Sequence, residues 1–312
     1  MKKHTTGIHH ITAIVGHPQE NIDFYAGVLG LRLVKQTVNF DDPGTYHLYF
    51  GEENGKPGTI ITFFPWPNAY QGRIGDGQVG VTTYVVPVGA MDFWKERLTK
   101  FNISYSETVR FGETFLQFDD PHGLHLELVE RVNGEDNGWT FGGVTKEVAI
   151  KGFGGAILYS CRPEETAETL VELMGLEVVG QEGDYKRFRA TADIGNIIDL
   201  KMTTGVRGRI GVGTVHHIAW RANDNQDHIE WQQYAMDLGQ HVTEVKDRNY
   251  FNSIYFRESG EILFEIATDS PGFAHDETPE TMGSELKLPA QYEHLRERLR
   301  ESLIPIEVRH LD

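Results

Sequence analysis

The chain contains two similar sequence segments that lie far apart. PQENIDFYAGVLGL begins at Pro18 and PEETAETLVELMGL begins at Pro163, and the two match position by position, with Gly175 on Gly30. Each phrase is typical of a helix that ends on a glycine. Because self-similarity over a long spacing is the signature of a repeated structural unit, we expect the chain to be built from copies of one module.

The repeated phrase belongs to a longer unit. In the first copy a β-type run at 7–17 precedes the helix at 18–29, and runs at 31–39, 45–50 and 58–64 follow it. The third copy repeats this order, with a strand at 154–160, a helix at 163–174 and strands at 177–179, 184–190 and 196–202. Looser copies are predicted at 79–86, 90–100, 113–119 and 124–129, and at 213–222, 227–238, 241–245, 250–257 and 262–267. The sequence thus predicts four βαβββ modules.

These modules are expected to pair, since a lone module would leave one face of its sheet bare. We therefore predict an α+β fold of two barrel domains, with modules at residues 7–66, 78–131, 149–204 and 212–269. Residues 270–312 lie outside the repeat and are predicted to form a C-terminal strap. Apolar residues at helical spacing over 291–303 predict an amphipathic helix within it.

A histidine pair opens two of the modules at the same place. The first module begins GIHHITAIVG and the fourth begins GTVHHIAWR, so His10 and His217 match, whereas modules two and three have Val79 and Gly155 there. For a pair that occurs twice at one repeat position, a metal role is favoured over hydrogen-bonded structural histidines, because imidazole is the commonest metal ligand.

A carboxylate recurs in the last strand of the modules. Glu265 has counterparts in Glu127 and Asp199, but the first module has Thr62 at this position. Modules one and four together supply two imidazoles and one carboxylate, the ligand set of a non-haem Fe(II) site with open positions. We therefore expect modules one and four to pair around a metal held by His10, His217 and Glu265, and modules two and three to form a metal-free barrel.

Neighbouring residues are placed by strand alternation. An ideal strand turns His9 and His216 away from the metal, although a β-bulge would bring them closer. If the last hairpin is centred near Gly260, Tyr255 lies opposite Glu265 and shares its sheet face, either as a substrate contact or as a tyrosine of the barrel wall. Arg248 is either a residue of the cavity mouth or a solvated loop arginine.

The composition excludes several classes of partner. The net charge of −17 argues against nucleic acid and anionic membranes. One cysteine, Cys161, indicates no disulfide framework and fits a reducing cytoplasm. There is no signal-like segment and no apolar run of membrane-spanning length.

Together these residues resemble the vicinal oxygen chelate superfamily, which contains glyoxalases, extradiol dioxygenases and bleomycin-resistance proteins. The resemblance is strongest to its branch of ring-cleaving dioxygenases that act on hydroquinones. It covers essentially the whole chain and is carried by GIHHITAIVG, VHHIAW, FEIATDSPGFAHDE and LPAQYEHLRERLRESLIP, in that order.

The resemblance implies two barrel domains of the vicinal oxygen chelate type and an Fe(II)-dependent dioxygenase that opens a hydroquinone-type or catechol-type ring with O2. The implied metal ligands are again His10, His217 and Glu265. The implied pocket residues are His9, Thr12, His216, Arg248 and Tyr255.

Several alternatives stay open. A glyoxalase-like isomerase or thiol-quinone lyase would use a metal without O2, and Thr62 argues against it, because a closed four-ligand site suits proton-transfer chemistry better. A protein that sequesters aromatic or quinone compounds is a third class, against which the intact ligand set argues. Mn(II) accepts similar ligands to Fe(II), and the edges of the sheets leave a homo-oligomer open.

Overall fold

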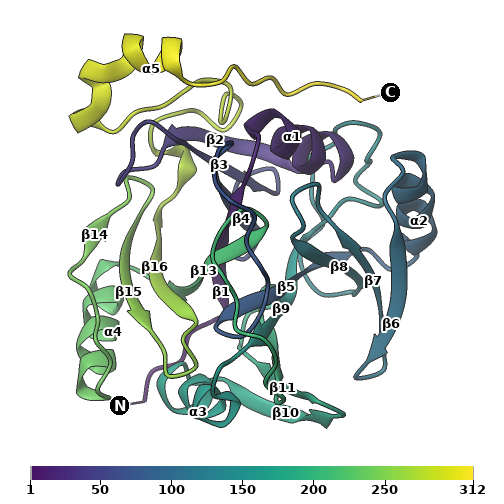
Figure 1. Ribbon diagram of the computed structural model, residues 1–312, viewed down its shortest axis with the longest axis vertical. Helices are drawn as coiled ribbons and strands as arrows, with labels where there is room; N and C mark the ends of the chain where they lie inside the picture. The colour runs from purple at the N-terminus through teal and green to yellow at the C-terminus, as the bar shows by residue number, and fades with distance from the viewer. Residues whose placement is uncertain (1, 312) are drawn as a thin grey trace.

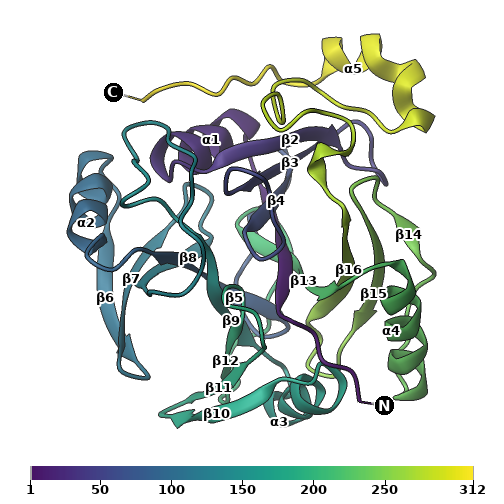
Figure 2. The same ribbon diagram turned by 180° about the vertical axis from the view of Figure 1, so that it is seen from behind.

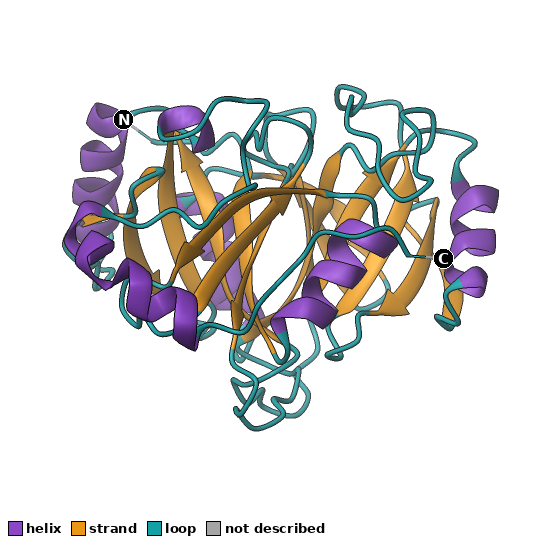
Figure 3. Ribbon diagram, turned by 90° about the horizontal axis from the view of Figure 1, so that it is seen from above, coloured by secondary structure: helices purple, strands orange, loops and turns teal. Residues whose placement is uncertain are grey.

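The structure is a computed structural model and describes residues 2–311. Its strands form two eight-stranded sheets, and the helices lie on the outside of the strand layers (Figures 1 and 3). The predicted fold class, an α+β chain with two glyoxalase-like barrel domains, is confirmed.

The first sheet combines the beginning and the end of the chain. Its order is β14-β15-β16-β13-β1-β4-β3-β2. Its strands are β1 (Ile8–Val15), β2 (Arg32–Val38), β3 (Tyr46–Gly51), β4 (Ile60–Pro65), β13 (Thr214–Ala222), β14 (Lys246–Asp247), β15 (Phe251–Arg257) and β16 (Leu263–Pro271). The two halves meet at the antiparallel pair β1–β13.

The second sheet repeats this arrangement with the middle of the chain. Its order is β10-β11-β12-β9-β5-β8-β7-β6, and the halves meet at the antiparallel pair β5–β9. Its strands are β5 (Gln78–Val86), β6 (Tyr105–Arg110), β7 (Glu113–Asp119), β8 (His125–Glu130), β9 (Gly152–Tyr159), β10 (Glu177–Glu182), β11 (Tyr185–Arg189) and β12 (Ile197–Lys201). From this order of strands we propose that each sheet consists of two modules. The first sheet would contain modules 7–66 and 212–269, and the second would contain modules 78–131 and 149–204.

The helices of modules one and three share an irregularity. In each, a short α-helix runs into a π-helix, α1 (Pro18–Ile22) into η1 (Asp23–Val28) and α3 (Pro163–Glu168) into η2 (Thr169–Leu173). Gly30 and Gly175 follow with φ of 69° and 73°, the left-handed conformation that ends a helix. The other two modules have regular helices, α2 (Met91–Lys100) and α4 (Asn225–Asp237).

The edges of the sheets differ from the predicted elements in two details. The second module has an additional strand, β6, whose side chains are mostly exposed and polar, so that it lacks the apolar alternation of a half-buried strand. The strand predicted at 241–245 is not formed. That segment is a loop attached to β15 through Thr243, and only β14 pairs regularly there.

The C-terminal strap crosses β2 and α1 (Figures 1 and 2). It contains η3 (Phe273–His275), η4 (Ala290–Leu295) and α5 (Arg296–Ser302), the last two over the stretch predicted to be helical. One anchor is Lys35 of β2, a fully buried side chain that is ion-paired with Asp276 and Glu277. Because a buried ammonium needs such partners, the strap is part of the folded domain.

No helix within residues 2–311 is both long enough and apolar enough to cross a lipid bilayer.

Candidate metal centre

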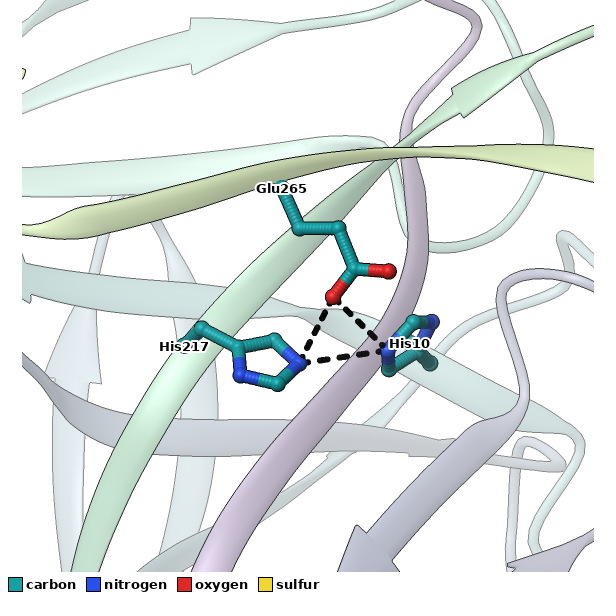
Figure 4. Close-up of side chains that lie close together, drawn as sticks. All are labelled: His10, His217 and Glu265. Atoms are coloured by element: carbon teal, nitrogen blue, oxygen red, sulfur yellow. Dashed lines mark hydrogen bonds and ion pairs between the residues drawn. The ribbon is translucent and has the colours of Figure 1, made fainter. Parts of the chain in front are cut away.

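The three predicted metal ligands lie on three adjacent strands in the middle of the first sheet, β16, β13 and β1. His217 Nε2 is 2.8 Å from Glu265 Oε2, and His10 Nε2 is 3.4 Å from the same oxygen and 3.3 Å from His217 Nε2 (Figure 4). All three side chains are buried. The structure therefore brings together one ligand from near the start of the chain and two from its last third.

The register of the strands explains this convergence. Across β1 and β13, His10 pairs with Ala219 and Thr12 pairs with His217, and across β13 and β16, Ala219 pairs with Glu265. The three ligands therefore sit on neighbouring rungs of one sheet face.

The donor set fits a divalent transition metal. Glu265 Oε2 is buried and, among the residues that the structure describes, no donor gives it a hydrogen bond, although both Nε2 atoms lie close to it. Burial lowers the pKa of His217, which favours the neutral imidazole that a metal requires. Two imidazole nitrogens and one carboxylate oxygen are the ligands of non-haem iron sites with open positions.

His9 fixes the orientation of His10. His9 Nε2 is 3.1 Å from the Thr268 carbonyl oxygen, and His9 Nδ1 is 2.9 Å from His10 Nδ1. Burial lowers the pKa of His9 far below its usual value, so its ring is neutral and its one N–H is assigned to the Thr268 carbonyl. His9 Nδ1 then accepts from His10 Nδ1–H, which leaves the lone pair of His10 on Nε2, toward the centre.

His216 repeats this arrangement beside His217. The two Nδ1 atoms are 2.8 Å apart, and burial lowers the pKa of His216 to about 3. His216 accepts from His217 Nδ1–H, so that His217 Nε2 also faces the centre. His9 and His216 thus orient the two histidine ligands through hydrogen bonds to their Nδ1 atoms. A register shift between Ile8 and His10 gives the strand the irregularity that brings His9 close.

A cavity of about 310 Å³ opens next to the three ligands. Of the predicted pocket residues, His216, Arg248 and Tyr255 line it, whereas His9 and Thr12 do not. Thr12 instead shares a hydrogen bond with Thr62, at 2.8 Å between the hydroxyl oxygens. The remaining lining residues, apart from the three ligands, are Asn39, Phe40, Asp41, Asp42, His47, Phe64, Trp66 and Phe251.

Tyr255 and Arg248 form the polar side of this cavity. Tyr255 pairs with Glu265 across β15 and β16, the register predicted from the hairpin, and Arg248 Nε donates to its hydroxyl at 3.3 Å. Arg248 Nη2 also donates to the Asp41 carboxylate at 3.1 Å. Burial raises the pKa of Tyr255, so that its phenol stays protonated at neutral pH.

The sequence reasoning missed His47, which lines the cavity on the side of the first module. Its Nε2 is 2.8 Å from the Thr62 hydroxyl and its Nδ1 is 2.8 Å from the Tyr49 hydroxyl. Strand alternation was a usable signal, because Tyr49 pairs with Thr62 and His47 lies two residues earlier on the same face.

In the second sheet the carboxylates at the positions of Thr62 and Glu265 are bound by arginine side chains. Glu127 pairs with Thr83 and Asp199 pairs with Ile157, the same rungs that Thr62 and Glu265 occupy in the first sheet. Arg110 donates to Glu127 Oε2 at 2.8 Å and to Asp199 Oδ2 at 2.6 Å, and all three residues are buried. Arg187 also donates to both Asp199 oxygens, so two guanidiniums supply the positive charge that these buried carboxylates need.

Known proteins are similar to this chain in both sequence and fold. The family model described as Glyoxalase/Bleomycin resistance protein/Dioxygenase superfamily matches residues 7–128. The "Putative ring-cleaving dioxygenase MhqO" of Bacillus subtilis (strain 168) is 70% identical over 312 residues, 100% of both chains. The "Chlorohydroquinone/hydroquinone 1,2-dioxygenase" of Sphingobium indicum is 36% identical over 94% of each chain. The crystal structure of a "putative dioxygenase" from Bacillus subtilis covers 99% of this chain and 100% of its own, with 70% identity and a TM-score of 0.98.

Proposed function

The chain belongs to the glyoxalase/bleomycin resistance protein/dioxygenase superfamily, and on this basis we propose that it is an Fe(II)-dependent dioxygenase that opens a hydroquinone-type aromatic ring with O2. The observation that carries the proposal is the three-ligand centre. The buried side chains of His10, His217 and Glu265 converge beside the cavity, and Thr62 occupies in its module the strand position that Glu265 occupies in the fourth.

The metal would be held by these three side chains and, when bound, would supply a redox-active centre with open positions for a ring oxygen and for O2. Thr62 supports this reading through its contacts. Its hydroxyl is engaged with both Thr12 and His47, so the chain holds that oxygen in a protein network. This arrangement favours oxygen chemistry over that of a four-ligand isomerase.

The cavity walls would hold and orient the ring. Phe40, Phe64, Trp66 and Phe251 provide apolar faces, and the Phe251 ring centroid lies 4.9 Å from that of His10. A ring held between such faces is shielded from water. Because aromatic contacts fix a plane, they also limit which ring carbon faces the metal ligands.

The polar side of the cavity would act on the hydroxyl groups. The guanidinium of Arg248 is placed to stabilise negative charge on a ring oxygen. The Tyr255 phenol, kept protonated by burial, is placed to donate a proton as the ring opens. His9 does not line the cavity and would act only through His10, whereas His216 contacts His217 and also faces the space in which the ring would bind.

The proposal is tested by His217→Ala, compared with His125→Ala as a control for the loss of an exposed histidine outside the site. We expect His217→Ala to lose bound iron and at least about 100-fold in turnover of methylhydroquinone, while His125→Ala keeps both. Full turnover by a His217→Ala protein without bound metal would overturn the metalloenzyme reading.

A further inference from the structure

We propose that Asp41 determines whether the site accepts a substrate with an additional negative charge. By neutralising Arg248 at the mouth of the cavity, it would select uncharged hydroquinones with alkyl or halogen substituents over rings that carry a carboxylate. The inference rests on the proposed function and names the substrate class of the same site.

The ion pair between Asp41 and Arg248 joins two distant loops over the cavity. Arg248 Nη2 is 3.1 Å from Asp41 Oδ2, and both residues line the cavity. The Arg248 side chain is 17% exposed, whereas that of Asp41 is 74% exposed, so the carboxylate sits at the entrance and the guanidinium lies deeper. Any anion that enters must compete with Asp41 for Arg248.

The loop that carries Asp41 is held in place on both sides. The Asp41 backbone N–H donates to Asn39 Oδ1 at 2.9 Å, and Tyr292 of the strap donates to the Phe40 carbonyl oxygen at 2.7 Å. The Thr45 hydroxyl donates to Asp42 at 3.1 Å. These contacts place Asp41 toward Arg248, so the pair is a built feature of the entrance.

The charges around the cavity leave no surplus for a carboxylate substituent. The lining carries three carboxylates, Asp41, Asp42 and Glu265, and one guanidinium, Arg248. A divalent metal would make this set neutral. A ring that binds through one deprotonated hydroxyl already adds a negative charge, and a ring carboxylate would add a second in a confined space.

The aromatic walls offer that carboxylate no compensation, and Asn39 and His216, which also line the cavity, are neutral groups that do not replace the charge of Arg248. The ring faces of Phe40, Phe64 and Phe251 carry no donor, and the indole N–H of Trp66 already donates to the Thr45 hydroxyl at 2.9 Å. A carboxylate held against aromatic faces without a cationic partner is disfavoured, whereas methyl or chloro groups pack well against such faces. The charges around the cavity and its aromatic walls therefore both favour an uncharged hydroquinone over a carboxylated one.

The test compares binding of methylhydroquinone and 2,5-dihydroxybenzoate, a hydroquinone with one carboxylate, to the Fe(II)-loaded protein without O2. Asp41→Asn removes the charge and keeps the size of the side chain. Asp136→Asn is the matched control, because Asp136 is 76% exposed and lies 3.1 Å from a buried lysine, Lys151, outside the cavity.

We expect Asp41→Asn to change the ratio of the two dissociation constants by about fivefold or more in favour of the carboxylated ring, which is the effect expected from losing one partly exposed ion pair. Asp136→Asn should leave this ratio unchanged. An unchanged ratio in Asp41→Asn, or a loss of methylhydroquinone binding without a gain for the carboxylated ring, would overturn the proposal. Turnover of methylhydroquinone by the unaltered protein is measured separately, so a failure of the proposed function is distinguishable from a failure of this inference.

Discussion

Thr62 occupies in β4 the position that Glu265 occupies in β16. Thr62 pairs with Thr12, two residues after His10, and Glu265 pairs with Ala219, two residues after His217. The two modules of the first sheet therefore present the same positions to the centre, but only one of them presents a carboxylate. This single difference gives the site three protein ligands.

Thr62→Val removes the hydroxyl and keeps the shape of the side chain. It leaves the His47 and Thr12 groups without their partner, so we expect unfolding in urea to show a loss of about 1–3 kcal/mol in stability. Because Thr62 is not a ligand in this account, bound metal should stay at one ion per chain. A variant that loses its metal would contradict that assignment.

Tyr255 and Tyr49 form a natural pair for comparison, since Tyr49 pairs with Thr62 as Tyr255 pairs with Glu265. Tyr255→Phe should lower kcat by about 100-fold with little change in KM, because it removes a proton donor. Tyr49→Phe removes only a hydrogen bond to His47 and should cost much less. Steady-state kinetics of both variants measure this difference. An equal loss of kcat in the two variants would argue against a proton-donor role for Tyr255.

The hairpin of β15 and β16 shows what could be predicted from the sequence. Centring the turn near Gly260 placed Tyr255 opposite Glu265, and this is the observed register. The register of a hairpin follows from its turn and from the two-residue period of a strand, and both are local. The repeat likewise located His10, His217 and Glu265, because equivalent modules place equivalent residues.

His9 shows what the sequence left open, and Arg110 shows what it did not indicate. His9 approaches His10 through a register shift that depends on how β1 and β13 pair, which one strand alone does not reveal. Arg110 ends a polar edge strand, and its partners Glu127 and Asp199 come from two other strands. Such contacts arise only once the sheet is assembled.

Arg110→Ala should destabilise the second sheet strongly. It would leave Glu127 buried with only the neutral donors Thr83 and Gln117, whereas Asp199 keeps Arg187, and removal of one partner from a buried ion pair typically costs about 3–5 kcal/mol. Denaturant unfolding should show this loss, whereas Arg162→Ala, which removes an exposed arginine, should show little change. Iron content per folded chain should not fall, and a loss of iron would contradict the separation of the two sites.

Asp120 should make stability depend on pH. Burial raises its pKa to about 6 in the folded protein, although Tyr25 and two backbone N–H groups donate to it. Its unfolded value is about 3.9, so its stabilising contribution is fully present below about pH 4 and is lost as the pH rises through 6. Two pKa units correspond to about 3 kcal/mol.

Asp120→Asn removes this titration. The stability of the unaltered protein minus that of the variant should therefore fall by about 3 kcal/mol between pH 4 and pH 7, as measured by urea unfolding at several pH values. A difference that stays constant over this range would show that the folded carboxyl is not shifted upward.

The central claim is that this chain opens a hydroquinone ring with O2, and labelled O2 tests it most directly. The protein is loaded with Fe(II) without air and then given ¹⁸O2 with methylhydroquinone or, separately, with catechol. We predict O2 uptake with methylhydroquinone and a ring-opened product that carries both labelled atoms. No uptake with either ring, despite one iron per chain, would contradict the account.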